Sequence, residues 1–292
     1  MTRSTFIDLH CHSTASDGTM SPTDVVKLGK DSGLSAMSLT DHDTIAGVAE
    51  AASAAQTFGI DFISGIELSC LYPRPGTMHL LGYGIDIQSP ALAELTRILI
   101  EGRDRRNELM VRKMHDSGIP ITLKELEDIA GGDVIGRPHM AKLLVDKNIV
   151  SNTAEAFRVY LGTGGSAWID KEQLTARQAI EMVHDSGGLA VLAHPSQLRK
   201  TNDAQLRAAI KDLVDLNLDG IEVIHTDHRE SFFDKLIDIA KKYDLLMTGG
   251  SDFHGANKPY IKLGKAGRRH VPREFFDQLS ERLKLTQASA GR

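Results

Sequence analysis

Short apolar segments rich in β-branched residues recur along the chain, and helical stretches separate most of them. Apolar runs of this kind, bounded by turn residues, are typical of buried strands. Their alternation with helices indicates an α/β domain, and about seven strands would close most naturally as a distorted β/α barrel. The predicted strands are Thr5–His12, Ala36–Thr40, Asp61–Ile66, Met78–Gly84, Gly188–Ala193, Gly220–His225 and Leu245–Gly249.

Two of the intervening helices have clear start signals. Ser21 stands before Pro22, which is the order of an N-cap serine and a proline in the first helical position. Thr175 and Gln178 have the spacing of a capping box, and Gly187 marks the end of that helix. We therefore expect helices to begin directly after Ser21 and after Thr175.

About a hundred residues between Gly84 and Gly188 contain no convincing buried strand. This length is far too great for a single crossover connection. We predict an inserted helical subdomain at residues 89–166, which covers the mouth of a catalytic barrel formed by residues 1–88 and 167–292. Its expected helices are Ser89–Ser117, Leu123–Ala130, Pro138–Lys147 and Ala154–Leu161.

Composition narrows the class of protein. With 292 residues, 41% hydrophobic and 25% charged, the chain has the material for a large globular domain and is not disordered or fibrous. No window approaches the ~18 apolar residues of a membrane span, and the two cysteines suit a reducing compartment. We expect a cytoplasmic monomer without a membrane partner. The net charge of 34 − 39 = −5 does not favour binding to duplex nucleic acid.

Candidate chemistry begins in the first strand. Strand alternation places Asp8, His10 and His12 on one face, and two imidazoles two residues apart can bind one metal ion. A pair of hydrogen-bonded surface histidines is the alternative. Asp8, and Asp43 later in the chain, are expected to orient imidazoles by hydrogen bonds.

Further metal-competent side chains stand at or just past the ends of other predicted strands. The carboxyl ends of barrel strands share one face, so these residues should converge in space. Together they number too many for one ion and suit two or three, an arrangement that phosphoryl hydrolysis exploits. The candidates are His10, His12, Asp17, His42, Glu67, His79, His194, Asp252 and His254.

The DLHCHS, SDG, TDHD, GIE, AHP and GSDFH elements resemble those of the polymerase-and-histidinol-phosphatase (PHP) superfamily of metal-dependent phosphoesterases. The resemblance is greatest to the branch with 3′,5′-nucleotide bisphosphate phosphatases and a 5′–3′ exoribonuclease. It implies a distorted (β/α)₇ barrel with an inserted helical domain, and it implies that all nine candidates above are ligands of two or three divalent ions. Manganese is expected first, and iron or zinc would also fit these donors.

The resemblance also implies residues that meet the substrate. Arg137 and His139 match the branch's Arg-x-His element facing the phosphate, and arginine can pair with phosphate oxygens through two hydrogen bonds. His228 matches a histidine near the phosphate. Asp17, Arg137 and His228 are thus the expected catalytic residues. A capped surface helix is the alternative for the segment that starts at Arg137.

The implied reaction is hydrolysis of a nucleotide phosphomonoester by a metal-bridging hydroxide. The expected substrate is a 3′,5′-nucleotide bisphosphate, which would give a nucleoside 5′-monophosphate and phosphate, or a short 5′-phosphorylated RNA. Three alternatives stay open at this point: a small-molecule phosphatase like histidinol phosphatase, an amidohydrolase-like enzyme that cleaves C–N bonds, and a non-catalytic metal-binding barrel.

Two features are expected to have no role in catalysis. The basic run from Arg103 to Arg106 is predicted to be a solvated helix face, with a polyanion-binding groove as the alternative. Trp168, the single tryptophan, is predicted to pack in the core, with stacking on a base as the alternative.

Overall fold

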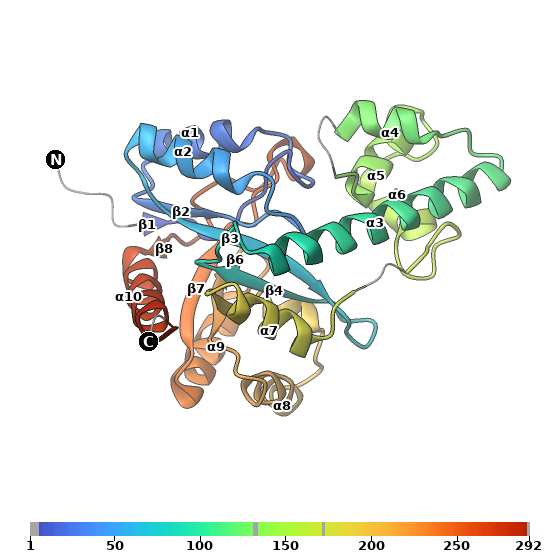
Figure 1. The fold of residues 1–292 in the computed structure, drawn as a ribbon. Coiled ribbons are helices and arrows are strands. Elements are labelled where there is room, and N and C mark those ends of the chain that lie inside the picture. The colour runs from blue at the N-terminus through green and yellow to red at the C-terminus, as the bar shows by residue number, and fades with distance from the viewer. Residues whose placement is uncertain (1–5, 131–133, 171–172, 291–292) are drawn as a thin grey trace.

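The computed structural model describes residues 6–130, 134–170 and 173–290, and the side chains of residues 6–288 outside these gaps. Thr5, the first residue of the first predicted strand, lies outside this part of the chain. Six strands form one curled sheet (Figure 1), in the order β2 (Ala36–Leu39), β3 (Asp61–Cys70), β4 (Met78–Tyr83), β5 (Leu189–Leu192), β6 (Gly220–His225) and β7 (Leu246–Gly250).

The first strand segment fills the space between the two edges of this sheet. β1 (Phe6–Ile7) pairs with the short strand β8 (Val271–Pro272). Directly after β1, the Asp8 N–H donates to the Ala36 carbonyl of β2 at 3.2 Å, and the Leu9 N–H donates to the Gly249 carbonyl of β7 at 3.1 Å. The sheet is thereby closed into a distorted barrel, which confirms the predicted fold class.

One strand runs against the others. β3 and β4 form an antiparallel hairpin, and β4 is also antiparallel to β5, whereas β2–β3, β5–β6 and β6–β7 are parallel. The expectation of a βα repeat is therefore wrong between β3 and β4, where residues 71–77 form a short connection without a helix. β3 also continues four residues beyond its predicted end at Ile66.

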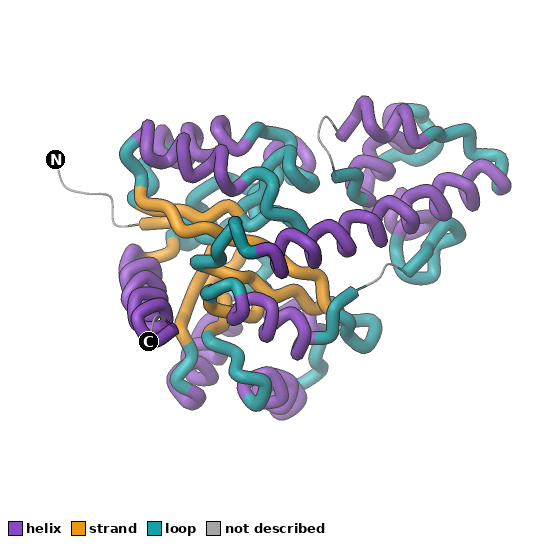
Figure 2. Tube along the Cα trace, viewed as in Figure 1, coloured by secondary structure: helices purple, strands orange, loops and turns teal. Residues whose placement is uncertain are grey.

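Helices cover the outside of the barrel (Figure 2). The predicted caps are confirmed, since the Ser21 hydroxyl accepts from the Asp24 N–H and the Thr175 hydroxyl accepts from the Gln178 N–H. Among the described residues, none of the helices combines the length and apolarity that crossing a bilayer requires. The helices are α1 (Pro22–Asp31), α2 (Val48–Phe58), α7 (Ala176–Asp185), α8 (Asp203–Val214), α9 (Glu230–Tyr243) and α10 (Arg273–Ala290), with short turns at Pro195–Leu198 and Gly255–Asn257.

The long segment between β4 and β5 is helical, as predicted. Before α7, its elements are α3 (Pro90–Asp116), α4 (Leu123–Ala130), α5 (Arg137–Asp146), α6 (Thr153–Ala156) and the π-helical turn Phe157–Leu161. Residues of these helices form an apolar cluster of their own, which includes Met110, Leu126 and Leu144, and α4 to α6 lie to one side of the barrel strands (Figure 1). The division of the chain at residues 89 and 166 stays a prediction.

Candidate metal centre

Histidine and carboxylate side chains from distant parts of the sequence converge at one end of the barrel. All nine predicted ligands belong to groups of three or four residues whose ligand atoms lie within 4.8 Å of one another. The groups are His12/Asp17/His42/His254, His10/Glu67/His194, His10/His12/Asp252, His10/Glu222/His225 and His42/Glu67/His79. The predicted convergence is therefore confirmed.

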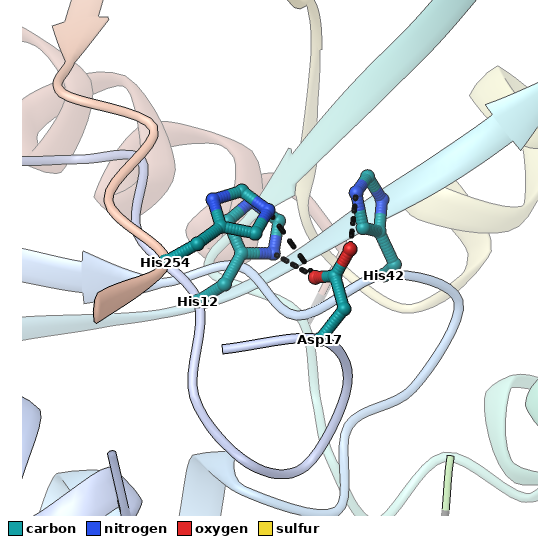
Figure 3. A group of neighbouring side chains, drawn as sticks. All are labelled: His12, Asp17, His42 and His254. Carbon is teal, nitrogen blue, oxygen red and sulfur yellow. Dashed lines mark ion pairs between the residues drawn. The ribbon is translucent and has the colours of Figure 1, made fainter. Parts of the chain in front are cut away.

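Asp17 lies between imidazoles from three separate elements (Figure 3). Its Oδ1 is 3.2 Å from His254 Nε2 and 3.8 Å from His12 Nδ1, and its Oδ2 is 3.9 Å from His42 Nε2. Burial alone would raise the pKa of Asp17, but His254 and His42 outweigh burial and hold that pKa well below its usual value. Asp17 is therefore an ionised oxygen donor at neutral pH.

Glu67 faces five imidazoles. Its Oε1 lies 2.8 Å from His79 Nδ1 and 2.9 Å from His194 Nε2. Its Oε2 lies 3.0 Å from His42 Nδ1 and 3.3 Å from the Nε2 atoms of both His10 and His12. Burial would raise its pKa, yet His42 and His79 hold the pKa well below the ordinary value. One buried carboxylate thus connects donors that belong to different groups.

The antiparallel direction of β4 explains how His79 reaches this site. His79 is the second residue of its strand and pairs in register with Ser69 near the end of β3. The expectation that His79 stands at the carboxyl end of a strand is therefore wrong. Because β4 runs in reverse, its beginning lies at the barrel face where the parallel strands end.

The donor set fits divalent cations. Several of its buried atoms have no hydrogen-bond partner among the described residues, although buried polar atoms are almost always paired. Imidazole nitrogens and carboxylate oxygens in such groups are ligands for zinc, manganese and iron. The unpaired atoms are His10 Nε2, both ring nitrogens of His12, Glu67 Oε2, His194 Nδ1 and His225 Nε2.

Glu222 supports the donors and was missed from the sequence. Its Oε1 accepts from His10 Nδ1 at 3.0 Å, and its Oε2 accepts from the His194 N–H at 2.7 Å. Burial would raise its pKa, but His10 and His225 lower that pKa to about 2. The available signal was a single acidic residue in the strand GIEVIH, whose other residues before His225 are glycine or apolar.

Asp252 has two partners that the sequence did not indicate. Lys258 Nζ lies 2.6 Å from its Oδ2, and His225 Nε2 lies 3.6 Å from the same oxygen. In the sequence His225 was only the last residue of a predicted strand, and Lys258 follows the short turn Gly255–Asn257. Their contacts depend on how the β7 loop folds over the barrel, which has no local sequence signal.

Asp8 does not orient an imidazole, contrary to expectation. Its carboxylate accepts from the backbone N–H groups of His10, Ser251 and Gly264, at 3.2, 3.0 and 2.7 Å. It therefore fixes the first strand to the loops that carry the late ligands. Asp43 accepts from the Ser69 N–H at 2.8 Å and pairs with Arg103.

A cavity of about 160 Å³ adjoins the donors. Asp17, His42 and His79 contribute to its wall. Four arginines also line it, namely Arg74, Arg103, Arg106 and Arg137. The predicted solvated helix face is wrong, because Arg103 and Arg106 are each only 5% exposed. Trp168 lines the same cavity instead of packing in the core, which corrects a second expectation.

Two predicted phosphate-binding residues lie apart from the described cavity wall. His139 is buried, and its Nδ1 accepts from the Gly136 N–H at 3.0 Å, which caps α5. His228 Nδ1 donates to the Val223 carbonyl at 3.0 Å, and burial followed by the nearby charge of His225 lowers the His228 pKa to about 4. A contact of either residue with substrate stays a prediction.

Comparison with known proteins gives a consistent result. The model of the PHP domain family matches residues 8–246. The chain is 38% identical over 258 residues to a 5′-3′ exoribonuclease of Haemophilus influenzae, covering 88% of this chain and 93% of that protein. It is 34% identical over 249 residues to a 3′,5′-nucleoside bisphosphate phosphatase of Chromobacterium violaceum, covering 85% and 87% of the two chains. The crystal structure of a provisionally described metal-dependent phosphoesterase from Bifidobacterium adolescentis superposes with a TM-score of 0.84 at 28% identity, covering 94% of this chain and 96% of that one.

Proposed function

The chain belongs to the PHP domain family, and from this premise we propose that it removes the 3′-phosphate from 3′,5′-nucleotide bisphosphates. The products would be a nucleoside 5′-monophosphate and inorganic phosphate. One observation carries the proposal: a single cavity has three of the metal-competent donors and four arginines in its wall. Such a cavity can hold a small, highly anionic ester.

The nine predicted ligands would hold two or three divalent ions, with Mn²⁺ as our first choice. Asp17 supports this choice, because a carboxylate among imidazoles makes the donor set harder and more negative. Bound ions of this kind supply an activated water and withdraw charge from phosphoryl oxygens. Glu67 would hold donors of neighbouring groups at a fixed spacing through its two oxygens.

Side chains near the donors are proposed to bind the phosphate of the substrate. Arg137, in the first position of α5, lines the cavity and can bind phosphoryl oxygens through two N–H groups. Arg103 is held by Asp43, so its guanidinium is fixed in the cavity wall. His228 keeps a neutral ring, and its Nε2 has no hydrogen-bond partner among the described residues. We propose that His228 lies near the substrate phosphate, where the bare Nε2 of its neutral ring can accept a hydrogen bond from a hydroxyl group.

The helical segment between β4 and β5 would form part of the substrate site. Arg103 and Arg106 come from α3 and Arg137 comes from α5, and all three line the cavity. We propose that residues 89–166 form a subdomain that covers the barrel mouth and brings these cations to the substrate. The enzyme would act as a cytoplasmic monomer.

The proposal is tested by measuring phosphate release from protein loaded with Mn²⁺ or Zn²⁺. The panel contains adenosine 3′,5′-bisphosphate, adenosine 3′-monophosphate, histidinol phosphate and a short 5′-phosphorylated RNA. We expect the bisphosphate to be the best substrate. Absence of phosphate release from every compound with either metal would refute the proposal, and cleavage of an amide panel instead would favour the amidohydrolase alternative.

Arg137→Ala probes the role of this arginine in the same assay. We expect kcat to fall by about 10²–10³, as when an oxyanion-binding donor is removed. Arg177→Ala is the matched control, because Arg177 lies on α7 with its side chain 64% exposed. An unchanged kcat in Arg137→Ala would show that α5 does not contribute to the proposed site.

Hydrolysis of short RNA from the 5′ end is the second candidate function. It is supported by the similarity to the exoribonuclease of Haemophilus influenzae, which is at least as great as that to the phosphatase. Gel analysis of the RNA in the panel distinguishes the two, since exonucleolytic cleavage shortens the RNA one nucleotide at a time whereas phosphatase action leaves its length unchanged.

A further inference from the structure

Arg106 is a buried cation without an ion-pair partner among the described residues. Its side chain lines the cavity and is 5% exposed. Its one hydrogen bond joins Nε to Asn107 Oδ1 at 3.0 Å, which leaves the two terminal nitrogens of the guanidinium for another partner. A buried charge is costly unless it is paired, so this guanidinium is suited to bind an anionic ligand group.

Neighbouring arginines add to the unpaired positive charge around Arg106. Arg103 lies one turn earlier on α3, and the Asp43 carboxylate is already paired with Arg103. Burial, followed by the charges of Arg103 and Arg137, lowers the pKa of Arg106 to about 9. Arg103, Arg106 and Arg137 therefore line one cavity, and among the described residues only Arg103 of these three forms an ion pair with a carboxylate.

Trp168 holds the outer side of this arginine group in place. The guanidinium carbon of Arg137 lies 4.7 Å from the indole centroid, and that of Arg74 lies 4.9 Å from it. Stacking of this kind restrains the plane of a guanidinium and leaves its N–H edges available for hydrogen bonds. The arginines are thus arranged for an anion before any ligand arrives.

We propose that Arg106 binds a second phosphate of the substrate, one that is not hydrolysed. This inference rests on the proposed function, and it names the residue that selects a bisphosphate over a monophosphate. The cavity extends from Asp17, His42 and His79 to Arg106. A nucleotide with two phosphates can therefore place one beside the metal donors and the other against Arg106.

The kinetic test compares two substrates that differ only in the second phosphate. Adenosine 3′,5′-bisphosphate and adenosine 3′-monophosphate are assayed with the metal-loaded wild type, with Arg106→Met and with Arg106→Lys. We expect Arg106→Met to lower the ratio of kcat/KM for the bisphosphate to that for the monophosphate by about 10- to 100-fold, the range for a lost charged hydrogen bond. Arg106→Lys should recover part of the ratio.

Arg112→Met is the control, because Arg112 is an exposed arginine on the same helix. It should leave the ratio at the wild-type value. If Arg106→Met lowers kcat/KM for both substrates equally, or changes neither, the inference is wrong. A thermal melt checks folding, and we expect Arg106→Met to melt no lower than wild type because it removes an uncompensated buried charge.

A binding measurement separates this inference from the proposed function. Trp168 is the single tryptophan of the chain, and it contacts Arg137 in the cavity wall. In chelator-treated protein, adenosine 5′-monophosphate should change the tryptophan emission of the wild type but not of Arg106→Met, whereas adenosine should change neither. This result without any phosphatase activity would retain the second-phosphate site and refute the reaction. An emission change that persists in Arg106→Met would refute the site.

Discussion

At the scale of single residues, Glu222 shows how one buried carboxylate can orient two donors. It accepts from the ring of His10 through one oxygen and from the backbone N–H of His194 through the other. These bonds fix the His10 ring and the turn that carries His194. Partners of this kind around metal ligands raise ligand basicity and hold ring orientation.

Glu222→Gln should therefore weaken metal binding. Glutamine has a single acceptor oxygen, so it cannot accept from His10 and His194 at the same time. We expect the affinity for Mn²⁺, measured by competition with a chromogenic chelator, to fall by about 10- to 100-fold. Glu230→Gln is the control, because the Glu230 side chain is 70% exposed and pairs with Arg269 at the surface. Equal affinities in the two variants would show that Glu222 does not orient the donors.

The metal donors themselves were predictable, and their supporting residues were not. Alternation along the first strand and the polar residues near other strand ends indicated where the donors lie, and the resemblance to the PHP superfamily selected the nine residues. Lys258 and His225 have no comparable periodic signal, and their contact with Asp252 depends on tertiary structure. The burial of Arg106 was missed because charge runs on helices are usually solvated, and the sequence does not show which helix face is covered.

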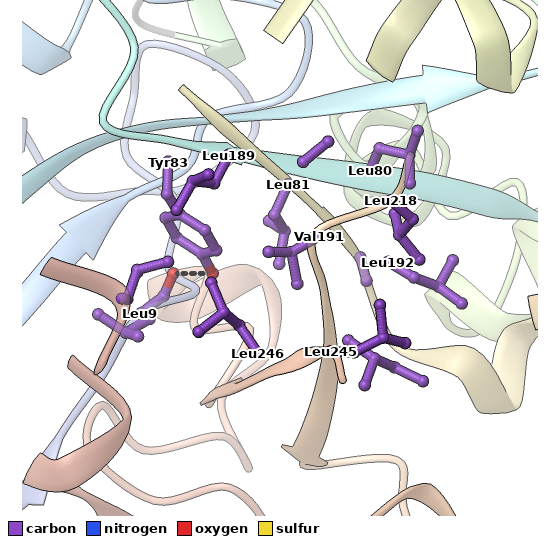
Figure 4. Packing of buried hydrophobic residues seen from close by; sticks show 14 of the residues in the cluster. Leu9, Leu80, Leu81, Tyr83, Leu189, Val191, Leu192, Leu218, Leu245 and Leu246 are labelled. Atoms are coloured by element: carbon purple, nitrogen blue, oxygen red, sulfur yellow. Dashed lines mark hydrogen bonds between the residues drawn. The ribbon is translucent and has the colours of Figure 1, made fainter. Parts of the chain in front are cut away.

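At the scale of elements, closure of the barrel depends on close packing around the first strand segment. The hydroxyl of Tyr83 on β4 donates to the Leu9 carbonyl at 2.9 Å inside the apolar core (Figure 4). On the other side, a Cβ atom at Gly250 would lie 2.3 Å from His10 Cβ and 2.4 Å from His10 N. The backbone of β7 therefore approaches His10 as closely as only glycine permits.

Gly250→Ala should destabilise the fold and displace His10. Overpacking of this kind costs about 1–3 kcal/mol, and we expect the free energy of unfolding in urea to fall by that amount, together with metal affinity. Gly164→Ala is the comparison, because a Cβ there meets nothing within 4 Å and only the positive φ of 83° is unfavourable. Retained metal affinity in Gly250→Ala would contradict this account of barrel closure.

An ion pair near the C-terminal end of α7 joins this helix to the segment before β6. His184 Nε2 lies 2.7 Å from Asp219 Oδ2, which also accepts from the Ala190 N–H of β5. The hydrogen bond to Asp219 raises the pKa of His184 above its ordinary value. This stabilisation is fully present below the unfolded-state pKa of about 6.5 and is lost as pH rises through the higher folded-state pKa.

His184→Gln should therefore destabilise the protein more at about pH 6 than at about pH 9. The difference should stay below about 1 kcal/mol, because the His184 side chain is 32% exposed and the pair is screened by solvent. Urea unfolding at both pH values measures it, and His115→Gln on the exposed face of α3 provides the control. An equal loss of unfolding free energy at both pH values would show that the His184–Asp219 interaction does not depend on a protonated His184.

The order of elements could be predicted from hydrophobic pattern, but the direction of one strand could not. Most strand and helix positions follow from local periodicity and caps, as at Ser21 and Thr175, but the first strand, predicted as Thr5–His12, is regular only over Phe6–Ile7. The reversal of β4 depends on the hairpin from Cys70 to Met78, which resembles any loop when only neighbouring residues are considered. Strand pairing is a property of the assembled sheet and is weakly encoded in a single segment.

At the scale of the whole molecule, bound ions should contribute to global stability. A ligand that binds only the folded state stabilises it by about 2.7 kcal/mol at a hundred times its Kd. We expect a chelator to lower Tm and added Mn²⁺ to restore it. Glu67→Gln, which alters the carboxylate shared by two donor groups, should show a smaller shift. An unchanged Tm after addition of the chelator would mean that the donors hold no stabilising ion.

The spread of the donors along the chain has a consequence for how the protein matures. Of the five donor groups found in the described residues, four include a residue after position 190, and one of these needs His254. During synthesis the early histidines leave the ribosome long before their partners exist. Each of those four groups can therefore assemble only after its late residue, at position 194 or beyond, has been synthesised, so that a cation bound there must arrive after that point.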